Sequence, residues 1–393
     1  LDISNKILLS LNESPSRAMV QMPTGSGKTR TAMNAIISWI RENNYSNNND
    51  FIIWMAHTEE LCEQAIESFE RSWLTYGAGT YRYYRYYGGR KLNKSDINGG
   101  IIFCTLQKLY SAKDNDKDIF DHITSTCSIL IFDEAHKALA KTYKYLINKI
   151  APDNKKCGLI GLSATPGRGK DPFENERLAR LFNNKLIRYD FGKDSILALR
   201  KMGILASIKR KEINGSNDFR LTRNDLDHIE KFHELPGSAL KIIGEDENRN
   251  NSIVQEIKYQ IDDGKQVLLF ACSVQHAKLL SALISMRHIS SASITSDMRK
   301  ITRSKIIEKF RNGDIEVLTN FGILTTGFDA PNIGAVFITR PTQSLILYSQ
   351  MIGRGLRGPK VGGRKSCVLI DVVDNISGFG DQSKIYDNFS QYW

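Results

Sequence analysis

The stretch "MVQMPTGSGKTRTAMNAII" (residues 19–37) places a glycine-rich turn between a short apolar run and a segment whose apolar residues have helical spacing. Its centre, "MPTGSGKT" (22–29), fits the P-loop pattern, except that Met22 stands where the pattern has its first glycine. Backbone N–H groups from Gly25 to Thr29 can surround a phosphate chain at the N-terminus of the helix. A turn that only joins a strand to a helix is the alternative, but Gly-Lys-Thr in register with both elements favours a phosphate site.

The side chains of this turn predict how a nucleotide is held. Lys28 can reach the β- and γ-phosphates, and the Thr29 hydroxyl can ligate Mg²⁺. The predicted nucleotide contacts are Thr24, Gly25, Ser26, Gly27, Lys28 and Thr29.

A second motif supplies the partner of the metal ion. The apolar run in "ILIFDEAHKAL" (129–139) ends at Asp133 and Glu134, so both carboxylates are expected at the carboxyl edge of a parallel sheet, where the P-loop also opens. Asp133 would hold Mg²⁺, usually through water, and Glu134 would orient or deprotonate an attacking water. Acidic residues also occur at ordinary helix N-termini, so it is the P-loop about a hundred residues upstream that favours a metal site.

Short β-branched runs alternate with helical stretches along the chain, in two series. This alternation is typical of parallel strands that are buried on both faces and joined by crossover helices. Two such series predict an α/β protein with two doubly wound parallel-sheet domains. The first series is "AMVQM" (18–22), "FIIWMAH" (51–57), "GGIIFCT" (99–105), "CSILIFDEAH" (127–136) and "CGLIGLSAT" (157–165), and the second is "QVLLFACS" (266–273), "SASITS" (291–296), "IEVLTN" (315–320), "IGAVFIT" (333–339) and "SCVLIDV" (366–372).

A polar and highly charged segment, residues 189–251, separates the two series and predicts a domain boundary near residue 195. We therefore expect one domain at residues 1–195 and a second at residues 196–393. The first strand of the second domain is expected around "ILASIKRKEI" (204–213), and a helical insertion or arm at about 214–250.

Composition limits the class of protein. The chain has 393 residues and a formal net charge of +11, which fits two domains and either a polyanionic partner or a solvated positive surface. No run approaches the roughly 18 apolar residues of a membrane span. The six cysteines are far apart and form no CxxC pair, which argues against a zinc cluster and favours reduced thiols in a cytosolic setting. The chain opens without Met or a signal-peptide pattern, so we expect it to be part of a longer protein.

An ordered set of motifs along nearly the whole chain resembles the superfamily 2 helicases and translocases. "DEAH" (133–136), "SAT" (163–165) and "QMIGRGLR" (350–357) resemble motifs II, III and VI, and "MPTGSGKT" resembles motif I. Four further segments resemble motifs Ia, Ib, IV and V. In that order they are "MAHTEELCEQA" (55–65), "TLQKL" (105–109), "LFACS" (269–273) and "TTGFDAP" (325–331). The resemblance implies two tandem RecA-like domains with a cleft between them, and ATP with Mg²⁺ as the bound nucleotide and metal.

The resemblance also implies roles for residues of the second domain. Gln350, Arg354 and Arg357 have the i, i+4, i+7 spacing of one helix face. In the superfamily this face closes over the nucleotide, and the arginines stabilise charge on the γ-phosphate. In the motif V segment, Gly327 and Asp329 are implied nucleotide contacts. The predicted catalytic residues are thus Lys28, Asp133, Glu134, Gln350, Arg354 and Arg357.

A single nucleic-acid strand that crosses both domains is the implied partner. Hydroxyl groups can hold its phosphates without selecting a sequence. The predicted contacts lie in or beside the resembling motifs: Thr58, Thr105 and Ser163 in the first domain, and Ser273, Thr295 and Thr325 in the second.

The stretch "GTYRYYRYYGGRK" (79–91) lies between motifs Ia and Ib, where the superfamily often has a Gly-Gly pair at the nucleic-acid groove. Gly88 and Gly89 fit that pair and let backbone approach a phosphate closely. Arg90, with Lys91, would add positive charge there.

The tyrosines of this stretch have two interpretations. A strand would turn Tyr81 and Tyr83 to one face and Tyr84 and Tyr86 to the other, which favours packing in a core. Base stacking on Tyr84 or Tyr87 is the alternative.

Three segments look most like bacterial helicases of the RadD type and the type III restriction helicase subunit. The wider XPB-like group shares these features. The segments are DEAH followed by Lys, "GILA" (203–206) and "QMIGRGLRGPKVGGRKSCVLIDVVDN" (350–375). Gln350-Met351, where RNA-dedicated relatives usually have His-Arg, favours DNA.

We therefore predict a nucleic-acid-dependent ATPase acting as a DNA helicase or translocase, in repair, recombination or defence against foreign DNA. An RNA helicase and an ATP-gated clamp with little turnover are the alternatives. We also predict a bacterial, cytoplasmic and nucleoid-associated location, with no membrane partner. A protein partner is expected to bind through regions outside this segment.

Overall fold

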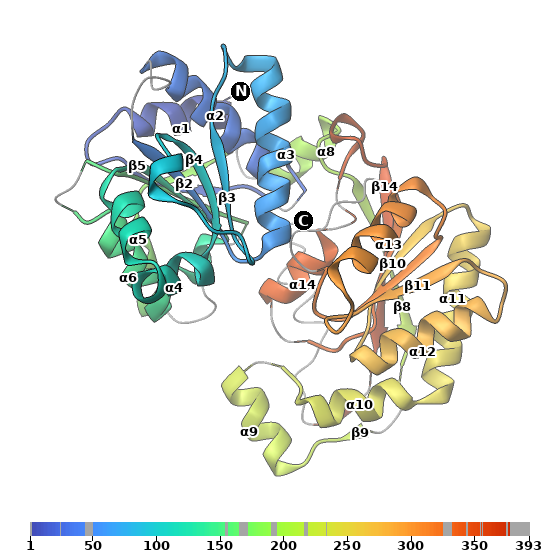
Figure 1. Ribbon diagram of the computed structural model, residues 1–393. Helices are drawn as coiled ribbons and strands as arrows, with labels where there is room; N and C mark the ends of the chain where they lie inside the picture. Colours follow the sequence, from blue (N-terminus) through green and yellow to red (C-terminus); the bar gives the residue numbers. More distant parts are fainter. Residues whose placement is uncertain are drawn as a thin grey trace. The chain divides into compact units, whose positions relative to one another are not determined.

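The protein is described from a computed structural model (Figure 1), which covers residues 2–23, 25–43, 50–153, 156–164, 172–189, 195–215, 219–232, 234–324, 332–342, 345–353, 355, 357–374 and 376–377. The chain divides into two compact units. The first is made of Leu1–Pro23 and Gly27–Asp190, and the second of Thr24–Ser26 and Phe191–Trp393. The boundary between the units thus lies about five residues before the predicted one.

The first unit is built on a seven-stranded sheet in the order β3-β4-β2-β5-β6-β1-β7, in which every pairing is parallel. Its strands are β1 (Arg17–Gln21), β2 (Phe51–Ala56), β3 (Tyr83–Tyr86), β4 (Gly100–Thr105), β5 (Cys127–Asp133), β6 (Gly158–Ser163) and β7 (Leu186–Arg188). Its helices are α1 (Asp2–Leu11), α2 (Lys28–Glu42), α3 (Glu59–Tyr76), α4 (Leu106–Asn115), α5 (Lys117–Ser125), α6 (Lys141–Ile150) and α7 (Pro172–Leu181).

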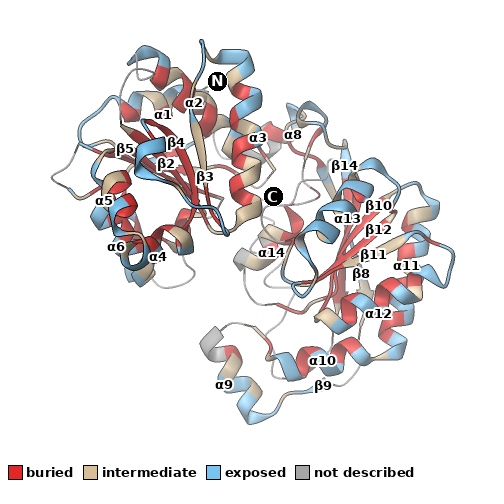
Figure 2. Cartoon of the chain, viewed as in Figure 1, coloured by how far each residue is buried: buried red, intermediate tan, exposed pale blue. Residues whose placement is uncertain are grey.

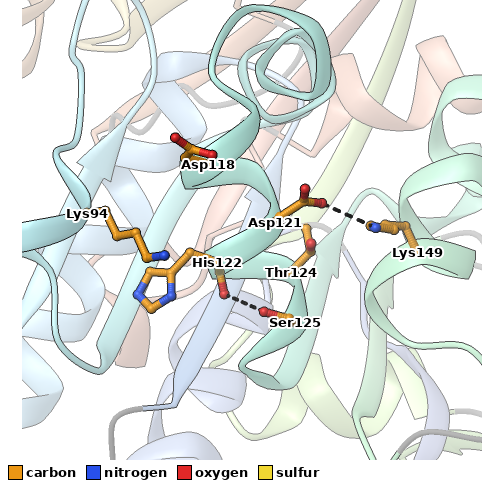
Figure 3. Close-up of a pocket in the computed structure, with 7 residues that line it drawn as sticks. All are labelled: Lys94, Asp118, Asp121, His122, Thr124, Ser125 and Lys149. Carbon is orange, nitrogen blue, oxygen red and sulfur yellow. Dashed lines mark hydrogen bonds and ion pairs between the residues drawn. The ribbon is translucent and has the colours of Figure 1, made fainter.

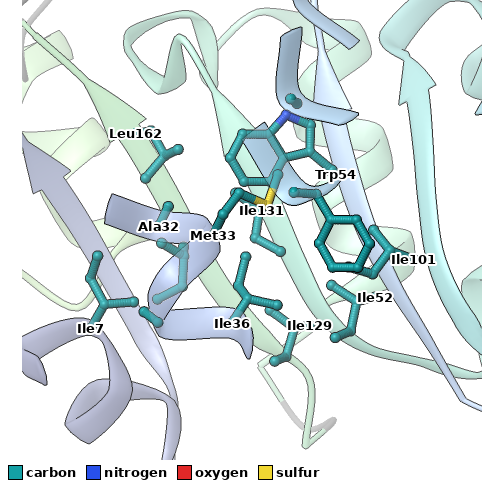
Figure 4. Close-up of a cluster of buried hydrophobic side chains, with 14 of the residues drawn as sticks. Ile7, Ala32, Met33, Ile36, Ile52, Trp54, Ile101, Ile129, Ile131 and Leu162 are labelled. Carbon is teal, nitrogen blue, oxygen red and sulfur yellow. The ribbon is translucent and has the colours of Figure 1, made fainter. Parts of the chain in front are cut away.

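Helices cover both faces of this sheet because its strands are apolar on both sides. Along β2, Ile52 and Trp54 belong to a cluster with α1, α2 and α3, part of which Figure 4 shows. Phe51 and Ile53 belong to a second cluster with α4, α5, α6 and α7 on the other face. Figure 2 shows the central strands buried between helices whose outer sides are exposed. This is the burial expected of a doubly wound parallel sheet.

The second unit has a six-stranded parallel sheet in the order β11-β12-β10-β13-β14-β8. Its strands are β8 (Ser207–Asn214), β10 (Gln266–Phe270), β11 (Ser291–Ile294), β12 (Val317–Asn320), β13 (Ile333–Ile338) and β14 (Ser366–Val373), with a separate parallel pair of β9 (Phe219–Arg220) and β15 (Ile376–Ser377). Its helices are α8 (Ser195–Lys201), α9 (Arg223–Phe232), α10 (Gly237–Glu245), α11 (Glu247–Asp262), α12 (Val274–Ser285), α13 (Lys300–Asn312) and α14 (Leu345–Ile352).

Two parallel-sheet α/β domains are thus confirmed. The strand expected at residues 204–213 is β8, at the edge of the second sheet. The helical arm expected at about 214–250 contains α9, α10 and the start of α11. None of the described helices is long and apolar enough to cross a membrane.

The tyrosine-rich stretch is mainly core. Tyr81 and Tyr83 pack against the cluster that contains Trp54, while Tyr84 and Tyr86 belong to the cluster on the opposite face. Tyr87 is fully buried, so base stacking on Tyr87 is excluded by its burial. The alternation of faces along β3 is the one the sequence predicts.

A buried ion pair joins helix α11 to the end of β14 in the second unit. The Arg249 guanidinium donates to both carboxylate oxygens of Asp374, at 2.7 and 2.9 Å, and also to the Thr339 carbonyl at 2.5 Å. Both charged side chains have an exposed fraction of 0%. A two-point pair of this kind fixes geometry as well as charge, so it holds α11 against the carboxyl ends of β13 and β14.

We predict that Arg249→Met lowers the free energy of unfolding by about 3–5 kcal/mol, because the Asp374 carboxylate is then buried without a cation. Urea denaturation followed by circular dichroism measures the loss. Lys258→Met on the same helix is the matched control, since it removes only an exposed pair with Asp262 and should cost a small fraction of that amount. Equal losses in the two variants would contradict the structural role of the buried pair.

Candidate nucleotide and nucleic-acid site

The turn between β1 and α2 has the backbone of a phosphate-binding loop. Gly25 and Gly27 have φ angles of 83° and 86°, in the left-handed region that L side chains rarely adopt. Gly27 is also the N-cap of α2, and no acidic residue occupies the first turn of that helix. The N–H groups and the helix dipole at this end therefore suit an anion. Ser26, Lys28 and Thr29 lie in the same turn, whereas Thr24 is outside the described residues.

Parallel pairing brings this turn and the carboxylate pair to one edge of the sheet. Strand β6 lies between β1 and β5, with Gln21 opposite Ser163 and Asp133 opposite Leu162. The ends of β1 and β5 therefore lie within one residue of the same level, with one strand between them. Asp133 is only 4% exposed, and its carboxylate accepts the N–H of Glu134 at 3.0 Å. The residues thus fit a nucleotide with a divalent cation: a helix N-terminus for phosphate and a nearby carboxylate for the metal.

Glu134 has an unusual backbone. Its φ and ψ angles of 57° and 47° are left-handed, an arrangement that costs a non-glycine residue on the order of 1–3 kcal/mol and is found most often at functional sites. Its carboxylate lies 3.3 Å from His136 Nδ1, and the same nitrogen lies 3.3 Å from the Ser163 hydroxyl. His136 therefore connects the DEAH segment with the SAT segment, a link that the sequence analysis did not predict.

Two titratable side chains, Lys137 and His57, interact electrostatically with Glu134. Burial lowers the pKa of the Lys137 ammonium, while Glu134 and Asp133 act in the opposite direction. Burial and then Lys137 lower the pKa of His57, against the effect of Glu134. A lysine amine and a neutral imidazole therefore lie within electrostatic reach of the carboxylates.

Family models match both parts of the chain that carry these motifs. Residues 2–168 match the model described as type III restriction enzyme, res subunit. Residues 248–358 match the helicase conserved C-terminal domain. The chain belongs to the superfamily 2 helicases. Within that superfamily of ATP-hydrolysing proteins, this helicase is related to the res subunit of type III restriction enzymes.

Individual relatives agree with the family models. IRC3 of Saccharomyces cerevisiae, named as an ATP-dependent helicase, is 28% identical over 378 residues, which cover 93% of this chain and 49% of IRC3. The helicase therefore spans about half the length of IRC3. The structure of the helicase MrfA bound to DNA has a TM-score of 0.69 at 15% identity and covers 99% of this chain and 51% of the MrfA chain. S. cerevisiae Dbp5 bound to RNA and ADP BeF3 has a TM-score of 0.68 at 17% identity, over 99% of this chain and 87% of the Dbp5 chain. Both structures show the shared fold.

The predicted strand-binding hydroxyls of the helicase are mostly helix caps. Thr58, Thr105 and Ser273 accept the N–H groups of Leu61, Lys108 and His276 at 3.3, 3.4 and 3.0 Å, at the N-termini of α3, α4 and α12. Thr58 and Ser273 each keep an O–H group to donate to a phosphate, whereas Thr105 is buried, with an exposed fraction of 6%, so the prediction that it contacts a strand is corrected.

The other predicted hydroxyl groups are either buried or outside the described residues. Ser163 and Thr295 are fully buried, so they do not present their side chains to a strand. The prediction for both is corrected by their burial. Thr325 is outside the described residues.

The Gly88-Gly89 loop lies against the helices that begin within motifs Ia and Ib. Gly88 has a φ angle of 59°, and an added Cβ would lie 2.8 Å from a Glu59 carboxylate oxygen on α3. Lys108 of α4 donates to the Gly88 carbonyl at 3.2 Å. The loop therefore needs glycine at residue 88 and has a cation, Lys108, that the sequence analysis missed.

Arg90 is partly engaged within the protein. Its guanidinium lies 4.8 Å from the centre of the Tyr87 ring and 3.5 Å from a carboxylate oxygen of Glu63. Glu63 also accepts from Arg85 at 3.2 Å. A strand phosphate at Arg90 would compete with Glu63, and no sequence pattern links these two residues.

The helix that contains the start of motif VI ends earlier than the sequence predicts. Gln350 lies on α14, but α14 ends at Ile352, and Arg357 forms an antiparallel bridge with Leu205. The prediction that Gln350 and Arg357 share a helix face is therefore wrong. The physical reason is Gly355, where an added Cβ would lie 2.4 Å from the Cys367 sulfur, so packing against β14 replaces another helical turn. Arg354, Gly327 and Asp329 are outside the described residues.

Two titratable side chains of the second unit have pKa values displaced in opposite directions. The Tyr348 hydroxyl, on α14, donates to Asp371 on β14 at 2.9 Å and accepts from Arg210 at 3.1 Å. Burial raises the pKa of Asp371 to about 7, against the effects of Tyr348 and Arg210. Burial and then Arg249 lower the pKa of His276 to about 3; its Nδ1 accepts the N–H of Cys272 at 3.1 Å.

A polar hollow on the first unit lies away from this site (Figure 3). It is lined by Lys94, Asp118, Asp121, His122, Thr124, Ser125 and Lys149. The His122 ring packs edge-on against Phe51, the first residue of β2. The hollow is therefore at the amino end of the strands, and the P-loop follows the carboxyl end of β1.

We predict that Gly27→Ala weakens ATP binding by the helicase about 5- to 30-fold, because a left-handed φ costs an L-residue roughly 1–2 kcal/mol. A Cβ at Gly27 would meet no atom within 4 Å, so the loss comes from backbone conformation. Gly237→Ala is the control, since that glycine has free space and no positive φ. A fluorescent ATP analogue measures the affinity, and an unchanged affinity in Gly27→Ala would contradict the phosphate site.

We also predict opposite pH dependences for two variants. Between its ordinary value of 6.5 and about 3, His276 binds a proton only in the unfolded state, so it makes stability fall as pH falls. Between its ordinary value of 3.8 and about 7, Asp371 keeps a proton only in the folded state, so it makes stability fall as pH rises. Relative to wild type, His276→Asn should therefore lose stability with rising pH from about 4 to 6.5, and Asp371→Asn should gain it.

For each variant, the difference from wild type in the free energy of unfolding should change by at most about 1.4 kcal/mol per pH unit. Urea unfolding at several pH values measures this change. Two differences of the same sign would contradict the assigned environments.

Proposed function

We propose that the chain is a nucleic-acid-stimulated ATPase that moves along or unwinds DNA. The observation that carries the proposal is the shared edge of β1 and β5, which brings the P-loop and the Asp133–Glu134 pair together across one intervening strand. A phosphate site alone would also suit a binding protein. A buried carboxylate beside a strained Glu134 adds the groups that hydrolysis needs.

The chain's own residues divide the work in this proposal. N–H groups of the P-loop and Lys28 hold the β- and γ-phosphates of ATP, and Glu134 orients the attacking water or accepts its proton. Thr29 and Asp133 would hold Mg²⁺, which when bound neutralises charge on the phosphates. We further propose that Gln350, Arg354 and Arg357 of the second unit, with Gly327 and Asp329, take part in the nucleotide cycle.

A strand would be held by its phosphates and not by its bases. Thr58 and Ser273 can each donate an O–H group, as proposed for Thr325, and the Gly88-Gly89 backbone allows a close approach. Arg90 and Lys108 supply positive charge beside that backbone. Such contacts give a grip that does not depend on sequence, as a moving enzyme requires.

DNA is favoured over RNA in the proposal. The shared fold does not decide between them, because the MrfA structure contains DNA and the Dbp5 structure contains RNA. Gln350-Met351 at the start of motif VI supports DNA, and the match to a restriction-enzyme subunit supports defence against foreign DNA beside repair or recombination. A bacterial, nucleoid-associated location and a protein partner outside this segment belong to the same proposal.

We predict that single-stranded DNA raises the ATPase rate of the chain, and that Lys28→Ala lowers the stimulated rate by at least about 100-fold, because Lys28 is the cation at the transferred phosphate. Arg30→Ala is the matched control, since Arg30 is exposed on the same helix. A coupled phosphate-release assay with DNA, RNA or neither measures the rates.

Stimulation by RNA but not by DNA would favour the RNA helicase alternative. Tight strand binding with background turnover would favour the clamp. Equal rates with and without nucleic acid would end the proposal. Stimulation should also weaken as salt rises, because the strand is held at its phosphates.

A further inference from the structure

His57 lies at the junction between the strand-binding and catalytic edges of the first unit. It follows Ala56, the last residue of β2, and directly precedes Thr58, the cap of α3. Its Nδ1 lies 3.1 Å from the hydroxyl of Tyr143 on α6, 86 residues further along the chain. The ring is therefore tied to another element at the point where a phosphate would reach Thr58.

Tyr143 continues this connection toward the carboxylates. Its ring packs on that of Phe132, with centroids 4.7 Å apart and planes at 33°. Phe132 directly precedes Asp133 and lies opposite Met55 on the neighbouring strand β2. Tyr143 is 5% exposed, so a shift of its ring is transmitted to packed neighbours and not absorbed by solvent.

Glu134 acts on the pKa of both rings. Burial first, and then Glu134, raise the pKa of Tyr143 to about 12, so its hydroxyl keeps its proton at neutral pH. His57 is influenced by Glu134 as well and is neutral there. The hydrogen bond thus joins two neutral groups, and such bonds contribute modestly and can break and re-form.

We propose that the His57–Tyr143 hydrogen bond couples strand binding at Thr58 to ATP hydrolysis at Asp133 and Glu134. The inference rests on the proposed function, since it assigns the pathway by which nucleic acid stimulates the ATPase. A phosphate held by Thr58 fixes the backbone of the adjacent His57, and His57 holds Tyr143. Tyr143 then fixes Phe132 and the start of the DEAH segment. His57 and Tyr143 are positioning residues, because neither touches the phosphates.

A purely structural role for Tyr143 makes a different prediction. Packing on Phe132 needs only the ring, which phenylalanine supplies, so Tyr143→Phe would behave as wild type. Coupling needs the hydroxyl. Tyr143→Phe therefore separates the two roles without opening a cavity.

The test compares Tyr143→Phe with Tyr145→Phe, two residues along α6, where the side chain is 43% exposed and packs on Tyr110. Steady-state ATPase rates are measured with and without a saturating single-stranded DNA, together with the KM for ATP and the Kd for DNA. We expect the stimulation factor of Tyr143→Phe to fall at least about fivefold, the low end of coupling between two sites. Its unstimulated rate, KM and Kd should stay at wild-type values, and Tyr145→Phe should match wild type throughout.

His57 provides an independent arm. His57→Asn keeps a side-chain amide able to accept or donate and should retain more stimulation than His57→Ala. This rescue by a hydrogen-bonding side chain is not expected of a residue that only fills space.

The outcomes separate the coupling from the proposed function. If wild type is stimulated and Tyr143→Phe is stimulated equally, the coupling is overturned and the ATPase proposal stands. If Tyr143→Phe loses stimulated and unstimulated rates in the same proportion, the coupling is also overturned. If wild type itself is not stimulated by nucleic acid, the proposed function fails and the coupling fails with it.

Discussion

The parallel register of β1, β6 and β5 is the constraint on which the site depends. Gln21 faces Ser163, and Asp133 faces Leu162, so the glycine turn and the carboxylates leave the sheet at the same edge. The register is strongly fixed, because a one-residue slip would exchange the two apolar clusters that cover the sheet. The buried clusters on both faces therefore set the geometry of the polar site at this edge of the sheet.

Several polar groups combine stability with the proposed function. The hydroxyls of Thr58 and Ser273 begin helices at the ends of β2 and β10. A helix start is also where N–H groups suit a phosphate, so the position that needs a cap is the position that can hold a strand. In the second unit, the buried side chains of Arg249 and His276 form hydrogen bonds with backbone groups just after strands β13 and β10.

The sequence predicted much of this because its signals are local. A glycine turn between a strand and a helix, or the alternation of Tyr83 and Tyr84 on β3, depends on neighbours in the chain. The end of α14 was not predictable in this way. The spacing of Gln350 and Arg357 suits a helix, but Gly355 packs against Cys367, a contact that only the folded sheet creates. The contacts of Glu63 with Arg90 and of His57 with Tyr143 likewise join residues that the sequence does not pair.

The most direct test is a crystal structure of the chain with a non-hydrolysable ATP analogue and Mg²⁺. The geometry predicts that the triphosphate lies along the Gly25–Thr29 backbone, with its terminal phosphate at Lys28 and the metal between Thr29 and Asp133. A nucleotide bound elsewhere, for example in the polar hollow at Lys94 and Lys149, with the glycine turn empty, would contradict it.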